Sequence, residues 1–307
     1  MIHASKHLVD SDEGQRLDAY VASLLDQLSR SQVQRLIQDG LVRVNGSPAR
    51  PSTRIKYGDS VYIEVVPEGL KEKPLPEELP LKIVHEDLDV IVVDKPPGLT
   101  VHPAPGHPRG TLVNALLARY PELEAVGERS RPGLVHRLDA DTSGLMVVAR
   151  SPRSYADLNR QLKEHSFSKV YLTLVRGLPQ PSEGAIDAPI ARNPRSRQKM
   201  GIVEGGRASQ TEYRTIEALD GFALLEVRPK TGRTHQIRVH MAATGHPVAG
   251  DAKYGGRAKF LRRQFLHACK LGFFLPSTGE PVEFASRLPP DLREALDYLA
   301  ADSARRY

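Results

Sequence analysis

The chain has 307 residues, of which 40% are hydrophobic and 26% are charged. This is the composition of a folded globular protein with room for two domains, and it excludes a disordered or fibrous chain. No stretch approaches the ~20 consecutive apolar residues that cross a bilayer, so we expect no membrane association. Lysine and arginine outnumber aspartate and glutamate by 43 to 37, a small excess that favours an anionic partner.

The chain contains a single cysteine, Cys269, which cannot form an internal disulfide bond. We expect it to be buried as a small apolar side chain. The first residues also lack the apolar segment of a secretory signal. Both observations predict a reducing, cytoplasmic environment.

The first 65 residues predict a small α+β module. An apolar face with helical spacing begins at Leu17, and a second helix begins near Ser29 or Ser31 and ends at Gly40. Asn45-Gly46 is the signature of a two-residue hairpin turn, and residues 61–65 alternate as a strand does. Arginines lie on the polar face of this module: Arg30, Arg35 and Arg43.

Residues 14–65 resemble the RNA-binding module of small-subunit ribosomal protein S-four. The resemblance implies that residues 1–65 bind RNA; a protein-binding module is the alternative. Residues 66–80 contain four prolines and alternating charges, which is typical of a linker.

The second domain is expected to span residues 81–307. Strands are predicted at 83–84, 89–94, 144–149, 169–176 and 223–227, with a helix at 154–165 between them. This mixed order predicts an α+β fold with a mixed, largely antiparallel sheet.

Two clusters of basic residues contain no acidic residue. The first comprises Arg192, Arg195, Arg197 and Lys199, and the second comprises Arg257, Lys259, Arg262 and Arg263. Either could be a solvated loop. Two such clusters in a basic chain favour contact with a phosphate backbone.

The familiar cofactor motifs are missing. No glycine-rich dinucleotide motif follows a strand, and the phosphate-loop and H-E-x-x-H motifs are absent. His235 and His240 are five residues apart, which places them on different sides of a helix or strand. We therefore expect no metal, no nucleotide and no other cofactor.

Two polar segments are candidates for a site. Residues 133–145 carry His136, Arg137, Asp139 and Asp141 just before an apolar strand, although spacing alone favours a surface turn with ion pairs. In residues 228–240, Thr234 is the predicted N-cap of a helix that runs to Gly245. This places Arg233 at the start of the helix, where the backbone N–H groups favour an anion. A carboxylate of the first segment could meet this arginine.

These segments resemble the RluA-type pseudouridine synthases. The resemblance covers residues 81–285 and rests on His136-Arg-Leu-Asp139-x-Asp-Thr-Ser-Gly-Leu145, Arg233-Thr-His-Gln-Ile-Arg238, Asp94-Lys-Pro-Pro-Gly98, Lys169-Val-Tyr171 and Gly250-Asp251-x-x-Tyr254-Gly255. It implies an isomerase that converts uridine in RNA to its C-glycoside. With the N-terminal module, the chain is most similar to the branch that modifies large-subunit ribosomal RNA, so its expected partner is that RNA or a ribosome precursor.

The resemblance also implies roles for individual residues. Asp139 is the catalytic carboxylate, acting as nucleophile or base. Arg233 holds Asp139 ionised and oriented, and Tyr171 stacks on the flipped uracil with its hydroxyl placed for the C5 proton. Further substrate contacts come from His136, Arg137, Leu138 and Ile237, with Arg137 filling the position that the extruded nucleotide leaves.

Several alternatives stay open at this stage. Attack at C1′, elimination to a glycal and addition to C6 of the base all use one aspartate. A catalytically idle RNA-binding factor with the same fold is a rival function. A glycoside or nucleoside hydrolase that pairs Asp139 with Asp141 is a second rival. We expect a monomer.

Overall fold

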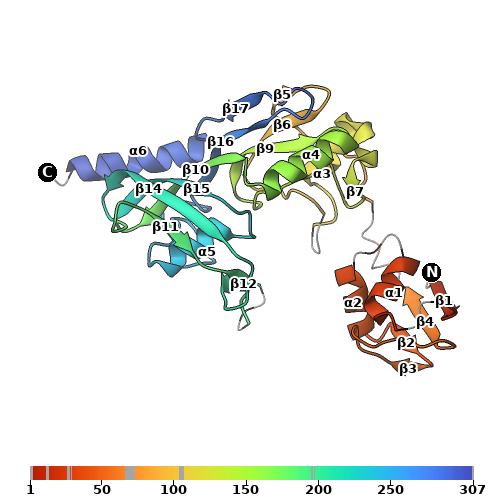
Figure 1. The fold of residues 1–307 in the computed structure, drawn as a ribbon. Helices are drawn as coiled ribbons and strands as arrows, with labels where there is room; N and C mark the ends of the chain where they lie inside the picture. Colours follow the sequence, from red (N-terminus) through yellow and green to blue (C-terminus); the bar gives the residue numbers. More distant parts are fainter. Residues whose placement is uncertain are drawn as a thin grey trace. The chain divides into compact units, whose positions relative to one another are not determined.

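The structure is a computed structural model, and it describes residues 3–11, 14–25, 28, 30–65, 73–103, 107–194, 196 and 198–305. The chain divides into two compact units, Met1–Lys73 and Pro74–Tyr307 (Figure 1). The boundary between the two falls within the predicted linker, part of which lies outside the described residues. Each unit has a hydrophobic core of its own.

In its described residues, the smaller unit is a four-stranded sheet, in the order β1-β4-β2-β3, with two helices. Its elements are β1 (His3–Leu8), α1 (Leu17–Leu24), α2 (Arg30–Gln38), β2 (Val42–Val44), β3 (Ser47–Pro48) and β4 (Ser60–Val65). Asn45 and Gly46 have φ angles of 52° and 78°, as the two-residue turn between β2 and β3 requires. The predicted helices and hairpin are confirmed, whereas β1 has no alternating pattern and was missed.

A buried carboxylate ties the two helices of this unit together. Asp18, 0% exposed, accepts hydrogen bonds from Arg16, Arg30 and Gln34. Arg30 therefore has a structural role, because one of its N–H groups binds Asp18. Arg35 and Arg43 are exposed and free of that network.

The larger unit is built on one mixed sheet. Within the described residues its strand order is β11-β14-β15-β10-β16-β9-β6-β5, and β17 also pairs with β16. The strands of this sheet are β5 (Ile83–Glu86), β6 (Val90–Lys95), β9 (Ser143–Ala149), β10 (Ser168–Arg176), β11 (Glu183–Asp187), β14 (Gln210–Leu219), β15 (Phe222–Pro229), β16 (Leu266–Phe274) and β17 (Pro281–Ala285). Two separate pairs of short strands are β7 (Gly127–Glu128) with β8 (Arg131–Pro132), and β12 (Ile190–Arg192) with β13 (Met200–Ile202). Each described pairing in this sheet is antiparallel except that of β16 with β9. The predicted largely antiparallel α+β fold is confirmed.

Helices cover both faces of this sheet (Figure 1). They are α3 (Leu112–Arg119), η2 (Pro121–Ala125), α4 (Pro152–Lys163), α5 (Gln236–Ala243) and α6 (Pro290–Arg305). Successive residues of a strand point to opposite faces. On β10, accordingly, Leu174 packs with Leu292 of α6, and Val175 packs with Met241 of α5. The helix α5 thus lies on the face opposite α6.

Two further sequence predictions can be compared with the structure. Cys269 is 9% exposed, and burial raises the pKa of its thiol to about 11, so it is the inert buried side chain that was expected. Among the helices that the structure describes, none is long and apolar enough to cross a membrane.

Candidate active site

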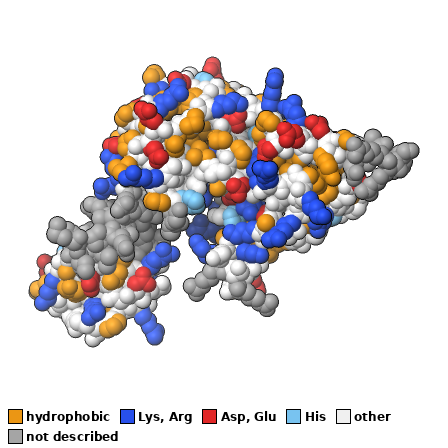
Figure 2. Space-filling model, turned by 180° about the vertical axis from the view of Figure 1, so that it is seen from behind, with side chains coloured by type: hydrophobic (Ala, Val, Ile, Leu, Met, Phe, Trp, Pro, Cys, Tyr) orange, Lys and Arg blue, Asp and Glu red, His pale blue; other side chains and the backbone are white. Residues whose placement is uncertain are grey.

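A pocket of about 570 Å³ lies in the larger unit. Much of its lining comes from the loop before β9, the first half of β10, the segment from the end of β15 into α5, and the end of α4 (Pro152–Lys163). In the space-filling view, lysine and arginine side chains gather around a hollow in this unit (Figure 2). The pocket contains residues from both of the polar segments that the sequence singled out.

The loop before β9 is positioned by a close approach of two strands. Ser143 and Gly144 pair with His267 and Ala268 of β16 in parallel register. Gly144 has a φ of +113°, and a Cβ atom there would lie 2.3 Å from the carbonyl oxygen of Ala268. Only glycine fits this position, which fixes where the loop enters the sheet.

Two basic side chains, Lys95 and Arg263, donate hydrogen bonds to backbone carbonyl groups of this loop. The Lys95 ammonium is 1% exposed and donates to the carbonyl oxygens of Pro96, Leu99 and Ala140 at 2.7, 3.0 and 2.7 Å. Burial lowers the pKa of Lys95 to about 7. Arg263 donates to the carbonyl oxygen of Asp141 at 2.9 Å. The loop is therefore fixed directly beside Asp139.

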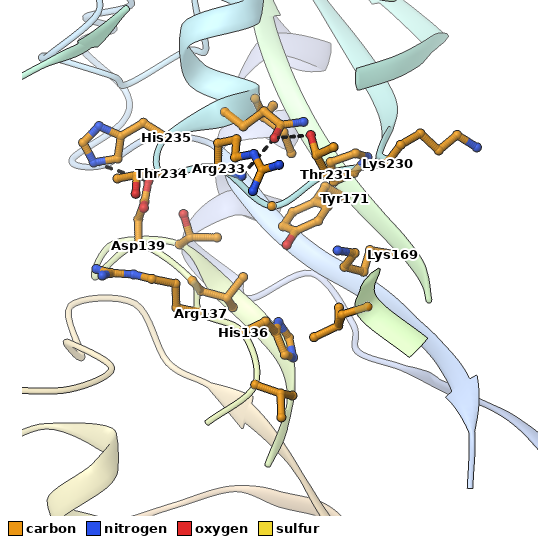
Figure 3. A pocket seen from close by; sticks show the side chains of 18 of the residues that line it. His136, Arg137, Asp139, Lys169, Tyr171, Lys230, Thr231, Arg233, Thr234 and His235 are labelled. Carbon is orange, nitrogen blue, oxygen red and sulfur yellow. Dashed lines mark hydrogen bonds and ion pairs between the residues drawn. The ribbon is translucent and has the colours of Figure 1, made fainter. Parts of the chain in front are cut away.

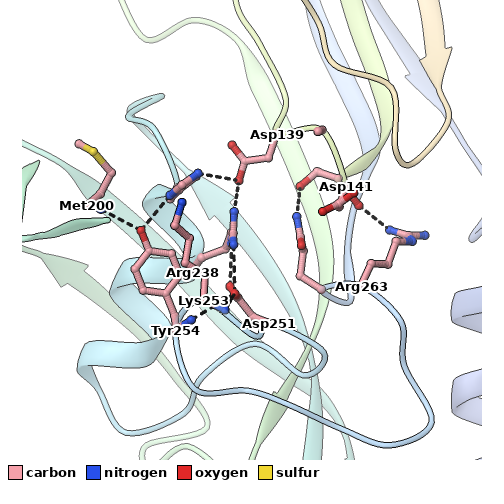
Figure 4. A network of polar contacts seen from close by, with 12 residues as sticks. Asp139, Asp141, Met200, Arg238, Asp251, Lys253, Tyr254 and Arg263 are labelled. Carbon is pink, nitrogen blue, oxygen red and sulfur yellow. Dashed lines mark hydrogen bonds and ion pairs between the residues drawn. The ribbon is translucent and has the colours of Figure 1, made fainter. Parts of the chain in front are cut away.

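Arg238 binds the carboxylate of Asp139 (Figure 4). Its Nη1 lies 2.7 Å from Oδ2 of Asp139, while its Nε and Nη2 lie 2.6 and 3.0 Å from the two oxygens of Asp251. The side chains of Arg238 and Asp251 are 8% and 1% exposed. Burial by itself lowers the pKa of Arg238, but the hydrogen bond to Asp251 and the two negative charges outweigh it and raise that pKa. Arg238 is thus a permanent, rigidly held cation.

The Asp139 side chain is 17% exposed and opens to the pocket. Among the described residues, its hydrogen bond and its ion pairs all fall on Oδ2. The other carboxylate oxygen, Oδ1, is left for a ligand.

The structure corrects the predicted partner of Asp139. Arg233 was expected to hold it, but Arg233 donates instead from Nε to the carbonyl oxygen of Ala208 at 3.1 Å. Arg233 lies in the loop before α5, as it would with either N-cap; the helix begins at Gln236, with His235 rather than Thr234 at the N-cap. Arg238 lies inside the helix, on the side that packs toward Asp139. Arg233 still lines the pocket.

Tyr171 projects into the pocket from β10 (Figure 3). The register of β10 against β16 shifts between Val170 and Tyr171, so that Cys269 has no partner across the ladder. Such a bulge redirects a side chain and is typical of strands beside active sites. Burial, followed by the negative charge of Asp139, raises the pKa of the Tyr171 hydroxyl, which therefore stays protonated.

Lys169 enters the pocket beside Tyr171, because the two residues share one face of β10. Burial lowers the pKa of its ammonium to about 8. A Cβ atom on Gly232 would lie 4.0 Å from Lys169 Nζ, so this ammonium faces the loop between β15 and α5. The sequence analysis used Lys169 only as part of a motif.

The other predicted contact residues differ in their surroundings. Leu138 and Ile237 are 4% and 5% exposed and form apolar parts of the wall, and Arg137 is exposed at its edge. His136 lines the pocket, and its Nε2 accepts the backbone N–H of Val147 at 3.0 Å, which fastens the loop to β9. Burial lowers the pKa of His136 to about 3, so its ring is neutral.

The predicted peripheral RNA contacts are only partly described. Lys199 is exposed, close to the hairpin of β12 and β13. Arg195 and Arg197 lie outside the described residues. In the part of the chain that the structure describes, no group of three or more histidine, cysteine or acidic residues could hold a metal ion.

Comparisons with known proteins agree with this geometry. A family described as RNA pseudouridylate synthase matches residues 89–243, and the S4 domain family matches residues 15–61. The RNA pseudouridine synthase YlyB of Bacillus subtilis is 44% identical over 291 residues, which cover 94% of this chain and 96% of that protein. The chain belongs to the RluA-type RNA pseudouridine synthases.

Further relatives of this synthase carry more specific names. The ribosomal large subunit pseudouridine synthase D of Xanthomonas campestris is 43% identical over 310 residues, covering 96% of this chain and 92% of that protein. Among solved structures, human RNA pseudouridylate synthase domain containing 1 has a TM-score of 0.56 and 31% identity, and covers 72% of this chain and 95% of that chain. As a pseudouridine synthase the protein is an isomerase.

Three residues of this site in the synthase had no role predicted from the sequence. Arg238, Asp251 and Tyr254 were all quoted within motifs, but none received a role. A signal was present for Arg238, because an arginine between Ile237 and Val239 in a helix flanked by apolar residues needs a buried acidic partner. Asp251, next to Gly250 in a short polar turn, is that partner.

Proposed function

We propose that this synthase isomerises specific uridines of large-subunit ribosomal RNA, with Asp139 as its single catalytic carboxylate and without a cofactor. The observation that carries the proposal is the arrangement around Asp139. One carboxylate oxygen is held by Arg238, which is itself fixed by Asp251, and the other opens to a pocket with Tyr171 in its wall. The names of several relatives support ribosomal RNA as the substrate.

In the proposed mechanism, Asp139 must be ionised, because a neutral acid can neither attack the sugar nor remove a proton. Arg238 stabilises this ionised form by a charge-assisted hydrogen bond, without a proton of its own to give up. The role of holding Asp139, which the resemblance implied for Arg233, belongs in this proposal to Arg238. Arg233 is instead a cation of the pocket wall, suited to an RNA phosphate.

Tyr171 and the apolar wall are proposed to hold the base. The ring of Tyr171 offers a stacking surface for uracil, and its hydroxyl can take up the proton leaving C5 as it passes its own proton to solvent or to a carboxylate. Leu138 and Ile237 exclude water from the same space. Attack at C1′, glycal formation and C6 addition all remain compatible with one carboxylate.

The basic residues outside the pocket are proposed to offset the cost of extruding the uridine, a few kcal/mol. Arg35 and Arg43 of the smaller unit and Lys199 of the larger unit are exposed and available to phosphates. Arg137 is proposed to fill the position that the extruded nucleotide leaves. A cytoplasmic location and a monomeric state stay predictions.

The test is a map of pseudouridines in large-subunit ribosomal RNA from cells that lack this chain. We expect one or more sites to be unmodified, and purified wild-type protein to restore them on that RNA. An Asp139→Asn variant should restore none. An unchanged map, or release of free uracil instead of an isomer, would contradict the proposal and favour the idle factor or the hydrolase.

A further inference from the structure

Tyr254 contacts the backbone of Met200 in the β12–β13 hairpin (Figure 4) and, through the same hydroxyl, His235 beside Asp139. The N–H of Met200 donates to the Tyr254 hydroxyl oxygen at 2.9 Å. The same oxygen lies 2.8 Å from Nδ1 of His235. A backbone N–H can only donate, so the hydroxyl oxygen accepts from Met200 and its own hydrogen is free to donate to His235.

With the Tyr254 hydroxyl on the side of Nδ1 and the Asp139 carboxylate on the side of Nε2, this arrangement favours the tautomer of His235 in which Nδ1 accepts from Tyr254. Burial, with help from the charges of Arg238 and Lys253, lowers the pKa of His235 against the opposing charges of Asp139 and Asp251. The ring is therefore neutral at pH 7, and one of its nitrogens carries the proton. Because Nδ1 accepts from Tyr254, that proton is on Nε2.

The protonated nitrogen faces the reacting carboxylate (Figure 3). His235 Nε2 lies 3.9 Å from Oδ2 of Asp139, slightly beyond the ~2.7–3.2 Å of a hydrogen bond. An N–H donor is thus held close to the same oxygen that Arg238 binds. Shortening the distance between these two atoms by less than about 1 Å would complete the hydrogen bond.

The backbone of His235 is strained in a way that serves this placement. Its φ is 57°, in the left-handed region, and it is the N-cap of α5 without making a side-chain cap. A non-glycine residue in this region costs free energy, and such residues gather at functional sites. Here the conformation places the ring between Tyr254 and Asp139.

Tyr254 also contacts the other group that holds Asp139. The Arg238 guanidinium lies over its ring, 5.2 Å from the centroid, and the rings of His235 and Tyr254 meet edge to face at 5.7 Å. The backbone N–H of Tyr254 donates to Asp251 at 3.2 Å. One tyrosine therefore supports both donors to the Asp139 carboxylate.

We propose that Tyr254 and His235 act as a positioning pair, in which the Tyr254 hydroxyl sets the His235 tautomer and His235 Nε2–H hydrogen-bonds Oδ2 of Asp139 when the target uridine is bound. The proposal rests on the proposed function of Asp139. His235 Nε2–H is then the second donor to Oδ2, beside Arg238, and the two donors hold the carboxylate in a fixed orientation while Oδ1 reacts. Neither residue needs to exchange a proton with the substrate.

The test is a double-mutant cycle of Tyr254→Phe and His235→Ala, read as the single-turnover rate of pseudouridine formation at saturating RNA. Tyr254→Phe keeps the ring beneath Arg238 and removes only the hydroxyl. We expect each single variant to be about tenfold slower, which corresponds to about 1.4 kcal/mol of activation free energy. The double variant should be no slower than His235→Ala, because Tyr254 acts through His235.

Further variants separate positioning from general structure. His235→Gln retains a side-chain N–H donor and should recover part of the rate lost in His235→Ala. Tyr213→Phe is the matched control, since its hydroxyl bonds the carbonyl oxygen of Pro181 at 3.3 Å, outside the Asp139 network, and its rate should be unchanged. Thermal unfolding and the RNA dissociation constant should stay near wild type throughout.

Additive losses in the cycle would overturn the proposal, because Tyr254 would then act independently of His235. A loss of RNA affinity without a loss of single-turnover rate would also overturn it. The proposed function fails separately: in that case the wild-type protein itself forms no pseudouridine.

Discussion

Replacing Arg238 tests which arginine holds the catalytic carboxylate. Arg238→Met removes three hydrogen bonds, one to Asp139 and two to Asp251, in a nearly closed environment. Arg233→Met is the matched control, because it removes an arginine of the same pocket whose Nε bonds the carbonyl oxygen of Ala208. The two variants change the same type of side chain five residues apart.

The expected magnitudes differ widely. Two unit charges ~4 Å apart attract by about 4 kcal/mol at an effective dielectric constant of about 20. Because this attraction keeps Asp139 ionised and oriented, its full loss sets an upper limit of about a thousandfold on the fall in rate, at about 1.4 kcal/mol for each factor of ten. Arg233→Met removes a hydrogen bond worth about 1 kcal/mol, so its rate should fall less than tenfold.

Stability has to be separated from catalysis in this comparison. Removing one partner of a buried ion pair costs about 3–5 kcal/mol of unfolding free energy, here because Asp251 is left buried and unpaired. Adding Asp251→Asn removes that charge and keeps an oxygen for the N–H groups of Lys253 and Tyr254. The double variant should regain stability without regaining rate.

The assay is the single-turnover rate of pseudouridine formation at saturating RNA, with thermal unfolding measured on the same samples. A larger loss for Arg233→Met than for Arg238→Met would refute the reasoning. So would recovery of the rate when Asp251→Asn restores stability, because the role of Arg238 would then be purely structural.

Two other predictions concern RNA binding. Burial sets the pKa of Lys169 at about 8, so its charge is present below pH 8 and lost above it. RNA affinity should therefore fall between pH 7 and pH 9 in the wild type and fall less in Lys169→Arg. If the RNA dissociation constant changed between these two pH values by the same factor in both proteins, Lys169 would not contact the RNA. Removal of residues 1–73 should weaken RNA binding and site selection while the rate at saturating RNA changes less than about threefold, because the larger unit has its own core. If the rate at saturating RNA fell by as large a factor as the RNA affinity, the smaller unit would take part in the chemistry.

Local patterns were sufficient to predict many elements of the fold. The helix at Leu17, the Asn45-Gly46 turn and the apolar strand before Ala149 each follow from neighbouring residues alone. The central strand β16 was not predicted, because both of its faces are covered and its residues show no alternation. Its place between β10 and β9 depends on residues far away in the sequence.

The site could be predicted only in part, for a related reason. Motif spacing correctly brought the Asp139 segment and the Arg233–Arg238 segment to one pocket. It could not decide which arginine meets Asp139, because that depends on where α5 begins. In the structure α5 begins at Gln236, after His235 in the left-handed conformation; Arg238 lies on the side of the helix toward Asp139, and Arg233 lies in the loop before it.

The most direct test of the central claim compares two carboxylates of one loop. Uridine in the target RNA carries a hydrogen isotope on C5, and this label is released to water when pseudouridine forms. The release is measured for Asp139→Asn and Asp141→Asn. Asp141 is exposed, and its backbone carbonyl makes the contact with Arg263, so Asp141→Asn should keep the wild-type rate within about threefold. Asp139→Asn should bind the RNA and release no label. Release by Asp139→Asn at a rate near wild type, or an equal loss in both variants, would contradict the claim that Asp139 alone carries the chemistry.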